Sequence, residues 1–222
     1  MELILNEIEV RVLGCLLEKE QITPDNYPLS LNSLKSACNQ KSSRSPIMSL
    51  EEKDIARAIF SLRDKKLAIE QTTVGSRTAK YAHCINRVFD FSAPELAVLY
   101  LLFVRGPQTV GELRSRSSRY YEFANSNETS QTLEKLTKKE DGPYITELPV
   151  QPGKKEPRYA HLFSGEVEIK IQESSINPNP SAAVREIHAE NERISKLEEE
   201  VEVLKTEIND LKKELLEFKE LF

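Results

Sequence analysis

Residues 75–83 read GSRTAKYAH, and residues 153–161 read GKKEPRYAH. Both segments fit the pattern G-x-[RK]-x-x-[KR]-Y-A-H, and they begin 78 residues apart. In each segment the glycine suits the tip of a β-hairpin, and the Tyr-Ala-His triplet falls in the strand that follows. Because the glycine, two basic positions and the triplet recur in register, the pattern indicates an internal duplication of one structural unit.

Three helical segments precede the first hairpin. Asn6 followed by Glu9, and Ser49 followed by Glu52, have the spacing of a capping box, which marks the start of a helix. Apolar residues then recur at helical spacing. We expect helices over residues 6–19, 30–39 and 49–66, followed by strands over residues 67–72 and 79–85.

The same order of elements precedes the second hairpin. Ser92 with Glu95, and Thr109 with Glu112, form two more capping boxes, and a third helix follows a polar segment. Strands are expected over residues 144–148 and 158–163. Three helices followed by a hairpin is the order of a winged helix. The sequence therefore predicts an α+β, mostly helical fold with two tandem winged-helix domains, residues 1–88 and 89–172.

The C-terminal segment carries a heptad ladder. Apolar residues recur every seven positions, with leucine or phenylalanine three positions later, and the flanking charges attract only in a parallel pair. Two Asn-Pro steps precede it. We predict a flexible linker over residues 173–183 and a parallel dimeric coiled coil over residues 184–222. The predicted dimer seam consists of Ile194, Leu197, Val201, Leu204, Ile208, Leu211, Leu215 and Phe218.

Six motifs carry a resemblance to a known family. They are LNEIEVRVLGCLLEKE (residues 5–20), TPDNYPLSLNSLKSACNQKSSRSP (23–46), GSRTAKYAH (75–83), RGPQTVGELRSR (105–116), EDGPY (140–144) and RYAHLF (158–163). Over about residues 4–164 the chain resembles the YceH family of bacterial proteins. The resemblance implies a tandem winged-helix fold. Because that family has no established biochemical function, it implies no catalytic or ligand residues.

The net charge of −5 is located in the tail. Residues 181–222 hold 7 Lys and Arg against 12 Asp and Glu, so residues 1–180 carry 24 of each sign. A nonspecific nucleic-acid binder usually has a basic domain, because phosphate neutralisation supplies most of its affinity. Any DNA contact of this chain must therefore come from local basic patches.

The sequence contains no motif of an enzyme or a metal site. Neither a GxGxxG motif, a P-loop nor a GxSxG elbow occurs. His83 and His161 occupy equivalent strand positions, but neither has a Cys, Asp or Glu at ligand spacing. Cys15, Cys38 and Cys84 are odd in number and widely spaced, so we expect small buried residues. We expect no enzymatic activity, no cofactor and no metal.

We expect no signal for export or membrane insertion in this sequence. Its N-terminus, MELILNEIEV, carries acids where a signal peptide carries basic residues. No apolar run approaches the roughly 18 residues that a membrane span needs. We expect a cytoplasmic protein without a membrane partner.

Double-stranded DNA is the partner that winged helices favour, with the third helix in the major groove and basic wing residues on phosphates. In the first domain that helix begins with Glu51, Glu52 and Asp54, which phosphates would repel. The second domain is better suited, since its third helix offers the neutral groups of Asn127, Thr129, Ser130, Gln131 and Thr132. The candidate DNA contacts are Lys41, Arg44, Arg77, Lys80, Arg114, Arg116, Arg119, Asn127, Gln131, Lys154 and Lys155.

Two function hypotheses remain open. The first is a homodimeric, transcription-regulator-like protein that binds DNA. The alternative is a protein-interaction adaptor, similar to the tandem winged-helix subunits that accompany chromosome-organising ATPases, and the neutral domains suit it. A partner's helix would then dock beside the second helix or at the acidic start of the third. DNA binding through phosphates must weaken steeply with salt, whereas a mostly apolar protein interface should not.

Overall fold

The computed structural model describes residues 3–71, 78–151, 153–154 and 156–165. All of them belong to one compact unit, Met1–Ile169. They form an α+β fold in which helices predominate over two small antiparallel sheets, in agreement with the predicted class. The linker predicted over residues 173–183 and the coiled coil predicted over residues 184–222 lie outside the described residues.

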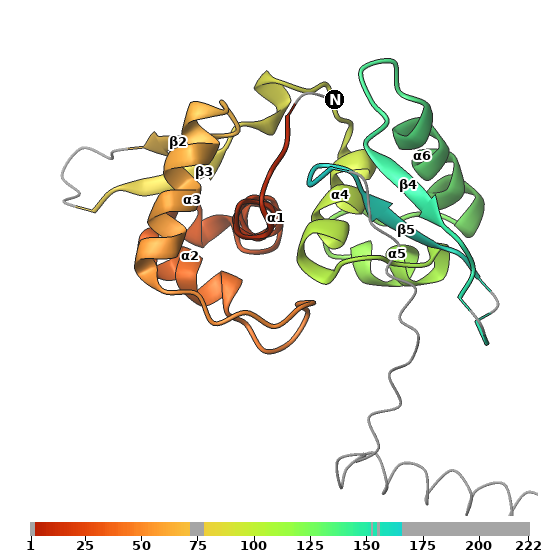
Figure 1. Cartoon of the computed structure of the whole chain (residues 1–222), viewed down its shortest axis with the longest axis horizontal. Coiled ribbons are helices and arrows are strands. Elements are labelled where there is room, and N and C mark those ends of the chain that lie inside the picture. Colours follow the sequence, from red (N-terminus) through yellow and green to blue (C-terminus); the bar gives the residue numbers. More distant parts are fainter. Residues whose placement is uncertain (1–2, 72–77, 152, 155, 166–222) are drawn as a thin grey trace, which may run out of the picture. The chain divides into compact units, whose positions relative to one another are not determined.

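The first half of this unit has the order helix, strand, helix, helix, hairpin, and the second half has a similar order (Figure 1). The first half comprises α1 (Glu7–Ile22), the 3-10 turn η1 (Pro24–Asn26), β1 (Leu29–Ser30), α2 (Leu31–Cys38), α3 (Glu52–Asp64), β2 (Ala68–Gln71) and β3 (Lys80–His83). The second half comprises η2 (Ile85–Arg87), α4 (Ala93–Arg105), α5 (Val110–Ser117), α6 (Ser126–Lys138), β4 (Ile145–Leu148) and β5 (Arg158–His161). The predicted helices and strands are confirmed, with shifts of a few residues at their ends.

Three of the four predicted capping boxes are confirmed: those that begin α1, α4 and α5. The prediction that Ser49 and Glu52 cap α3 is wrong. Glu51 is the N-cap residue, and its backbone N–H donates to Asp54 Oδ2 at 3.0 Å. The reason is tertiary, since the Asn39 side chain bonds both backbone groups of Leu50 at 2.8 Å and keeps this residue outside the helix.

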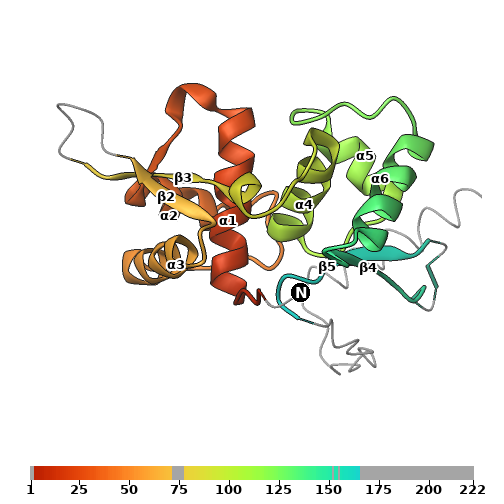
Figure 2. The ribbon, with the colours of Figure 1, turned by 90° about the horizontal axis from the view of Figure 1, so that it is seen from above.

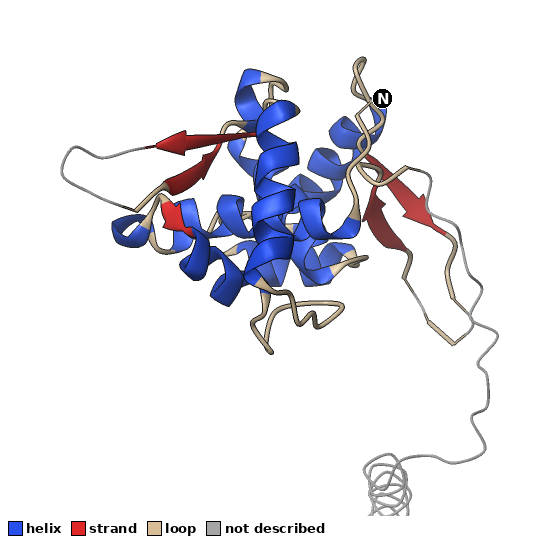
Figure 3. Cartoon of the chain, turned by 60° about the vertical axis from the view of Figure 1, so that its left-hand side comes forward, coloured by secondary structure: helices blue, strands red, loops and turns tan. Residues whose placement is uncertain are grey.

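Both hairpins recruit a third backbone segment that the sequence analysis missed. β3 pairs with β2, with Ala68 opposite His83, and its other edge pairs with β1, where Leu29 lies opposite Tyr81. In the second half β5 pairs with β4, and its other edge forms a bridge between Tyr159 and Gln108. Figure 3 shows the strands beside the helices. The two Tyr-Ala-His triplets therefore occupy matching places, which agrees with the duplication read from the sequence.

Helices α1 and α4 pack against each other, and both views of Figures 1 and 2 show them side by side. In the first half α1 contacts α2, α3 and β3, while in the second half α4 contacts α5, α6 and β5. Each half is thus organised around its first helix. The contact between these two helices, α1 and α4, connects the halves, and we call it the join. Gly14 on α1 permits this close approach, because a Cβ atom there would meet Phe103 and Val104 on α4.

The buried apolar side chains of the two halves form one continuous cluster. At its second-half end, the rings of Phe91 and Tyr144 meet edge to face with centroids 4.8 Å apart. The backbone N–H of Leu5 donates to the carbonyl of Phe163 at 2.7 Å, so the segment before α1 is tied to the second hairpin. The predicted boundary between residues 88 and 89 stays a prediction, and the halves on either side of it share a core.

Candidate functional site

The turn between α5 and α6 is held by the carboxylate of Glu128. Its two oxygens accept hydrogen bonds from the Tyr121 hydroxyl and from the backbone N–H of Ala124, each at 2.7 Å. The Asn125 side chain caps α6 by accepting from the Glu128 N–H at 3.0 Å. The bonds from Tyr121 and Ala124 hold the pKa of Glu128 below its ordinary value. The carboxylate that orders this turn is therefore charged at neutral pH.

Four of the predicted DNA contacts lie on these elements, and we call Arg114, Arg119, Asn127 and Gln131 the α5–α6 surface. All four residues are exposed. Arg114 NH2 donates to the carbonyl of Ala124 at 3.3 Å, which places this guanidinium beside the turn. Within the described residues, the side chains of the other three make no hydrogen bond or ion pair. Their donors and acceptors are available to a ligand.

Thr129 and Thr132, which the sequence analysis places among the groups that α6 offers to DNA, are buried. Their hydroxyls donate to the carbonyls of Asn125 at 3.3 Å and Glu128 at 2.9 Å, one turn earlier in the chain. That expectation is wrong for both residues, because they lie on the core face of the helix. Ser130 is exposed.

The remaining predicted contacts are distributed over the unit. Lys154 is exposed between β4 and β5, Lys41 is exposed in the loop after α2, and Lys80 is partly buried at the start of β3. Arg77 and Lys155 lie outside the described residues. The structure thus brings one group of predicted contacts together around the α5–α6 turn.

Arg44 corrects the sequence analysis, because it is not an exposed phosphate contact. Its side chain is fully buried, and its NH2 lies 2.6 Å from Glu18 Oε2 while NH1 donates to Oε1 at 3.2 Å. Its Nε donates to the carbonyl of Ala37 at 3.0 Å. A carboxylate partner offsets the cost of burying this guanidinium, and Glu18 on α1 supplies it. This pair fastens the loop between α2 and α3 to α1.

Arg116 is partly engaged. Its NH1 donates to the side-chain oxygen of Gln108, and its NH2 lies 3.4 Å from Glu112 Oε1. Glu112 also accepts from Arg158, whose NH1 lies 3.0 Å from Oε2. The predicted role of Arg116 in DNA binding stays a prediction.

Acidic side chains at the start of α3 make local contacts. Glu51 and Asp54 cap each other's backbone groups, and Lys53 Nζ lies 2.8 Å from Glu51 Oε2. Farther along, α3 exposes the ring of Phe60, which is 73% accessible. Sequence reasoning missed this residue, which lies between Ile59 and Leu62, two buried residues of the apolar stripe. An exposed aromatic ring on a surface helix is a feature of protein interfaces.

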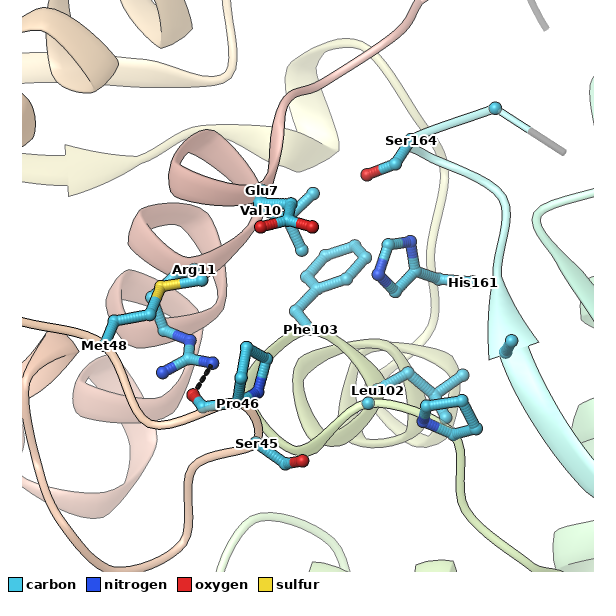
Figure 4. A pocket seen from close by; sticks show the side chains of 14 residues that line it. Glu7, Val10, Arg11, Ser45, Pro46, Met48, Leu102, Phe103, His161 and Ser164 are labelled. Atoms are coloured by element: carbon cyan, nitrogen blue, oxygen red, sulfur yellow. Dashed lines mark hydrogen bonds between the residues drawn. The ribbon is translucent and has the colours of Figure 1, made fainter. Parts of the chain in front are cut away.

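Residues of α1, α4 and β5 and of neighbouring loops line a hollow of about 260 Å³. Figure 4 shows the side chains around it. His161 packs edge-on against Phe103, with ring centroids 5.1 Å apart. Burial lowers the pKa of His161 to about 4, so the imidazole is neutral at pH 7. Its Nδ1 is buried and has no hydrogen-bond partner among the described residues. The buried Arg11 also lines the hollow, and its NH2 donates to the carbonyl of Pro46 at 2.7 Å.

The chemistry of the two equivalent histidines differs. His83 Nε2 lies 2.7 Å from Glu20 Oε2, an acidic partner that is distant in sequence and that the analysis of spacing missed.

Among the described residues, no group of three His, Cys, Asp or Glu is arranged to hold a metal ion. The three cysteines are buried and unpaired, as predicted. No helix in the described ranges has the length and apolar character of a membrane span.

Comparison with known proteins places the sequence in a family. Residues 5–154 match a family model described as "Protein of unknown function, DUF480". A "UPF0502 protein" of Geobacter metallireducens is 51% identical over 201 residues, which cover 90% of each chain. Another from Geotalea uraniireducens is 48% identical over 222 residues and covers 100% of both chains. One from Vibrio vulnificus is 43% identical over 212 residues, with 94% of this chain and 95% of the relative covered.

Proposed function

The chain belongs to the DUF480 family of proteins of unknown function, and we propose that it is a regulator that binds double-stranded DNA through tandem winged-helix modules. The repeated order of helix, short extended segment, helix, helix and hairpin supports the winged-helix interpretation. The motifs quoted above support our identification of the family with the YceH proteins, a name that the three relatives do not carry. The proposal is of a cytoplasmic protein that is not an enzyme.

The observation that carries this proposal is the exposure of the polar side chains on the α5–α6 surface. Asn127 and Gln131 lie four positions apart on α6, so both project from one side of the helix. Amide side chains of this kind form paired hydrogen bonds with adenine in the major groove. Arg119 adds a cation that no described carboxylate neutralises. The fixed Glu128 turn supports the proposal, since the surface is ordered before DNA arrives.

The heptad ladder supports a homodimer as the binding species. Two copies that are joined by their tails present two sets of modules, which raises the effective concentration of the second set once the first has bound. The replacement of Leu204 and Leu211 by Glu should yield monomers in mass photometry, because charges in the seam oppose helix pairing. Asn209→Glu, which falls outside the apolar seam, is the matched control and should leave the dimer intact. Monomers for both variants would argue against the seam.

A titration of the full chain against fluorescent genomic and random-sequence DNA tests the DNA proposal. Anisotropy measured at about 50 mM and about 200 mM salt should show a steep loss of affinity. We expect Arg119→Glu to reduce the salt slope by about 1, the loss of one phosphate contact. The double change Asn127→Ala and Gln131→Ala should weaken sequence preference more than random binding. Arg87→Glu makes the same charge change at an exposed arginine of η2, and it should bind like the original protein.

Phe60 favours a second candidate, the protein-interaction adaptor. Its ring is flanked on the exposed face of α3 by Arg57, so the face joins an apolar anchor to a cation. Absence of DNA binding at low salt, together with a partner complex that survives high salt, would favour this function over DNA binding. Phe60→Ser should then release the partner, and Arg119→Glu should not.

A further inference from the structure

A second hollow, of about 470 Å³, is lined by four arginines. Arg44 comes from the loop after α2, Arg105 ends α4, Arg116 belongs to α5, and Arg158 begins β5. The polar side chains of Gln108 and Gln151 also line it. Cations from segments far apart in sequence are thus gathered around one space, and the lining includes no acidic residue.

Two carboxylates behind the lining neutralise part of this charge. Glu18 pairs with Arg44, as described above, and Glu112 is shared between Arg116 at 3.4 Å and Arg158 at 3.0 Å. Four guanidinium groups therefore face two carboxylates, and Lys19 also contacts one of these, Glu18, at 3.4 Å, so the surplus is at least two positive charges. Such a surplus is unfavourable in a partly enclosed space unless an anion enters it.

Arg105 is the cation that lacks a partner. It is partly buried, and among the described residues its guanidinium makes no hydrogen bond or ion pair. Burial, and in second place the nearby charge of Arg116, lower the pKa of Arg105. Its backbone carbonyl is held by the Gln108 side chain, which donates to it at 3.2 Å. The main chain that carries Arg105 is therefore fixed beside the hollow.

We propose that this hollow binds the phosphoryl group of a small phosphorylated molecule, with Arg105 and Arg116 as its principal partners. Guanidinium groups donate pairs of parallel hydrogen bonds that match phosphate oxygens. A phosphate monoester carries close to two negative charges at neutral pH, which matches the two surplus cations. The volume exceeds the size of a phosphate ion, so an organic part fits beside the glutamines. The bound anion would link the loop after α2 to α5 and β5, and would thereby regulate the join between the two halves.

The test measures binding to the full chain in the absence of DNA, so its result is independent of the proposed DNA function. Inorganic phosphate, pyrophosphate and AMP are each added up to about 10 mM, with sodium chloride at the same ionic strength as reference, and thermal melting and calorimetry are recorded. At least one phosphate compound should raise the melting temperature of the original protein by several degrees. Arg87→Gln, the control at an exposed arginine, should respond in the same way.

Arg105→Gln is the decisive variant, because it removes a cation that has no partner and should fold normally. Without ligand it should melt at the same temperature as the original protein or higher, since a repulsion has been removed. With phosphate compounds its melting temperature should not rise. An equal rise in Arg105→Gln, or no response of the original protein to all three compounds, would overturn the proposal. If Arg105→Gln weakens only DNA binding while no phosphate compound binds, the hollow serves DNA phosphates and the small-molecule proposal is wrong.

Discussion

Gly14 on α1 lies so close to Phe103 on α4 that a Cβ atom at position 14 would be 2.7 Å from the Phe103 Cβ. It would also lie 2.9 Å from Val104 Cγ1. Both contacts are shorter than atoms tolerate, so any side chain at position 14 forces the two helices apart. The join between the two halves of the unit thus depends on a missing side chain.

Gly14→Ala should destabilise the protein by about 1–3 kcal/mol, because overpacking of a dense core strains side chains and backbone. Urea unfolding measures this loss. The matched control is Gly111→Ala in α5, where the nearest atom to an added Cβ is 3.9 Å away. That change should be neutral or stabilise by up to about 1 kcal/mol, since alanine favours helix. Equal effects of the two substitutions would mean that α1 and α4 do not pack this closely in solution.

The buried pair of Arg44 and Glu18 should respond asymmetrically to substitution. Arg44→Met removes the buried partner of the Glu18 carboxylate, which keeps only the contact with Lys19 at 3.4 Å, and should cost about 3–5 kcal/mol in urea unfolding. The double change Glu18→Leu and Arg44→Met should recover much of that loss, because the carboxylate is removed together with the guanidinium that pairs with it. Lys138→Met, which removes the exposed pair with Glu134, should cost less than about 1 kcal/mol. A harmless Arg44→Met would show that the guanidinium is exposed after all.

Protonation of His161 should lower the free energy of unfolding of the protein in acid. Its pKa is about 4 in the folded protein and about 6.5 in an unfolded chain, so the unfolded state binds more protons between these values. The stabilising contribution is complete above about pH 6.5 and is lost progressively as the pH falls toward 4. At pH 5 the loss amounts to about 2 kcal/mol.

His161→Leu should remove this part of the pH dependence while other groups continue to titrate. Unfolding by urea at pH 7.5 and pH 5 gives the comparison, as the difference between the two proteins at each pH. If the free-energy difference between variant and original is the same at both values, the imidazole is not held neutral by burial.

Phe60 and Ile59 are adjacent on α3 and should behave in opposite ways. Phe60 is 73% exposed, so Phe60→Ser should change the free energy of unfolding by less than about 0.5 kcal/mol. Ile59 is buried, so Ile59→Ser should cost more than about 2 kcal/mol, through the loss of apolar contacts and the burial of a hydroxyl. A large cost of Phe60→Ser would place its ring in a core contact and weaken the adaptor alternative.

Local signals predicted the elements well because they act over a few residues. Asn6 with Glu9, and Ser92 with Glu95, cap helices through bonds that reach only three positions along the chain. The Tyr-Ala-His triplets likewise marked the second strand of each hairpin. The cap of α3 escaped prediction, since Asn39 acts on Leu50 from another segment. The β1 and Gln108 pairings also escaped, since very short strands have no periodicity to read.

For the candidate site, the sequence by itself determined which residues carry charge and hydrogen-bonding groups, and where the helices that hold them begin and end. Only the tertiary structure decided which of those groups remain available. Lys41 and Arg44 are three positions apart in one polar loop, yet one is exposed and the other is buried on Glu18, 26 residues earlier in the chain. Side-chain accessibility and ion pairing depend on which distant segments come into contact in the folded chain. The periodicity of the sequence reports local structure and does not specify those contacts.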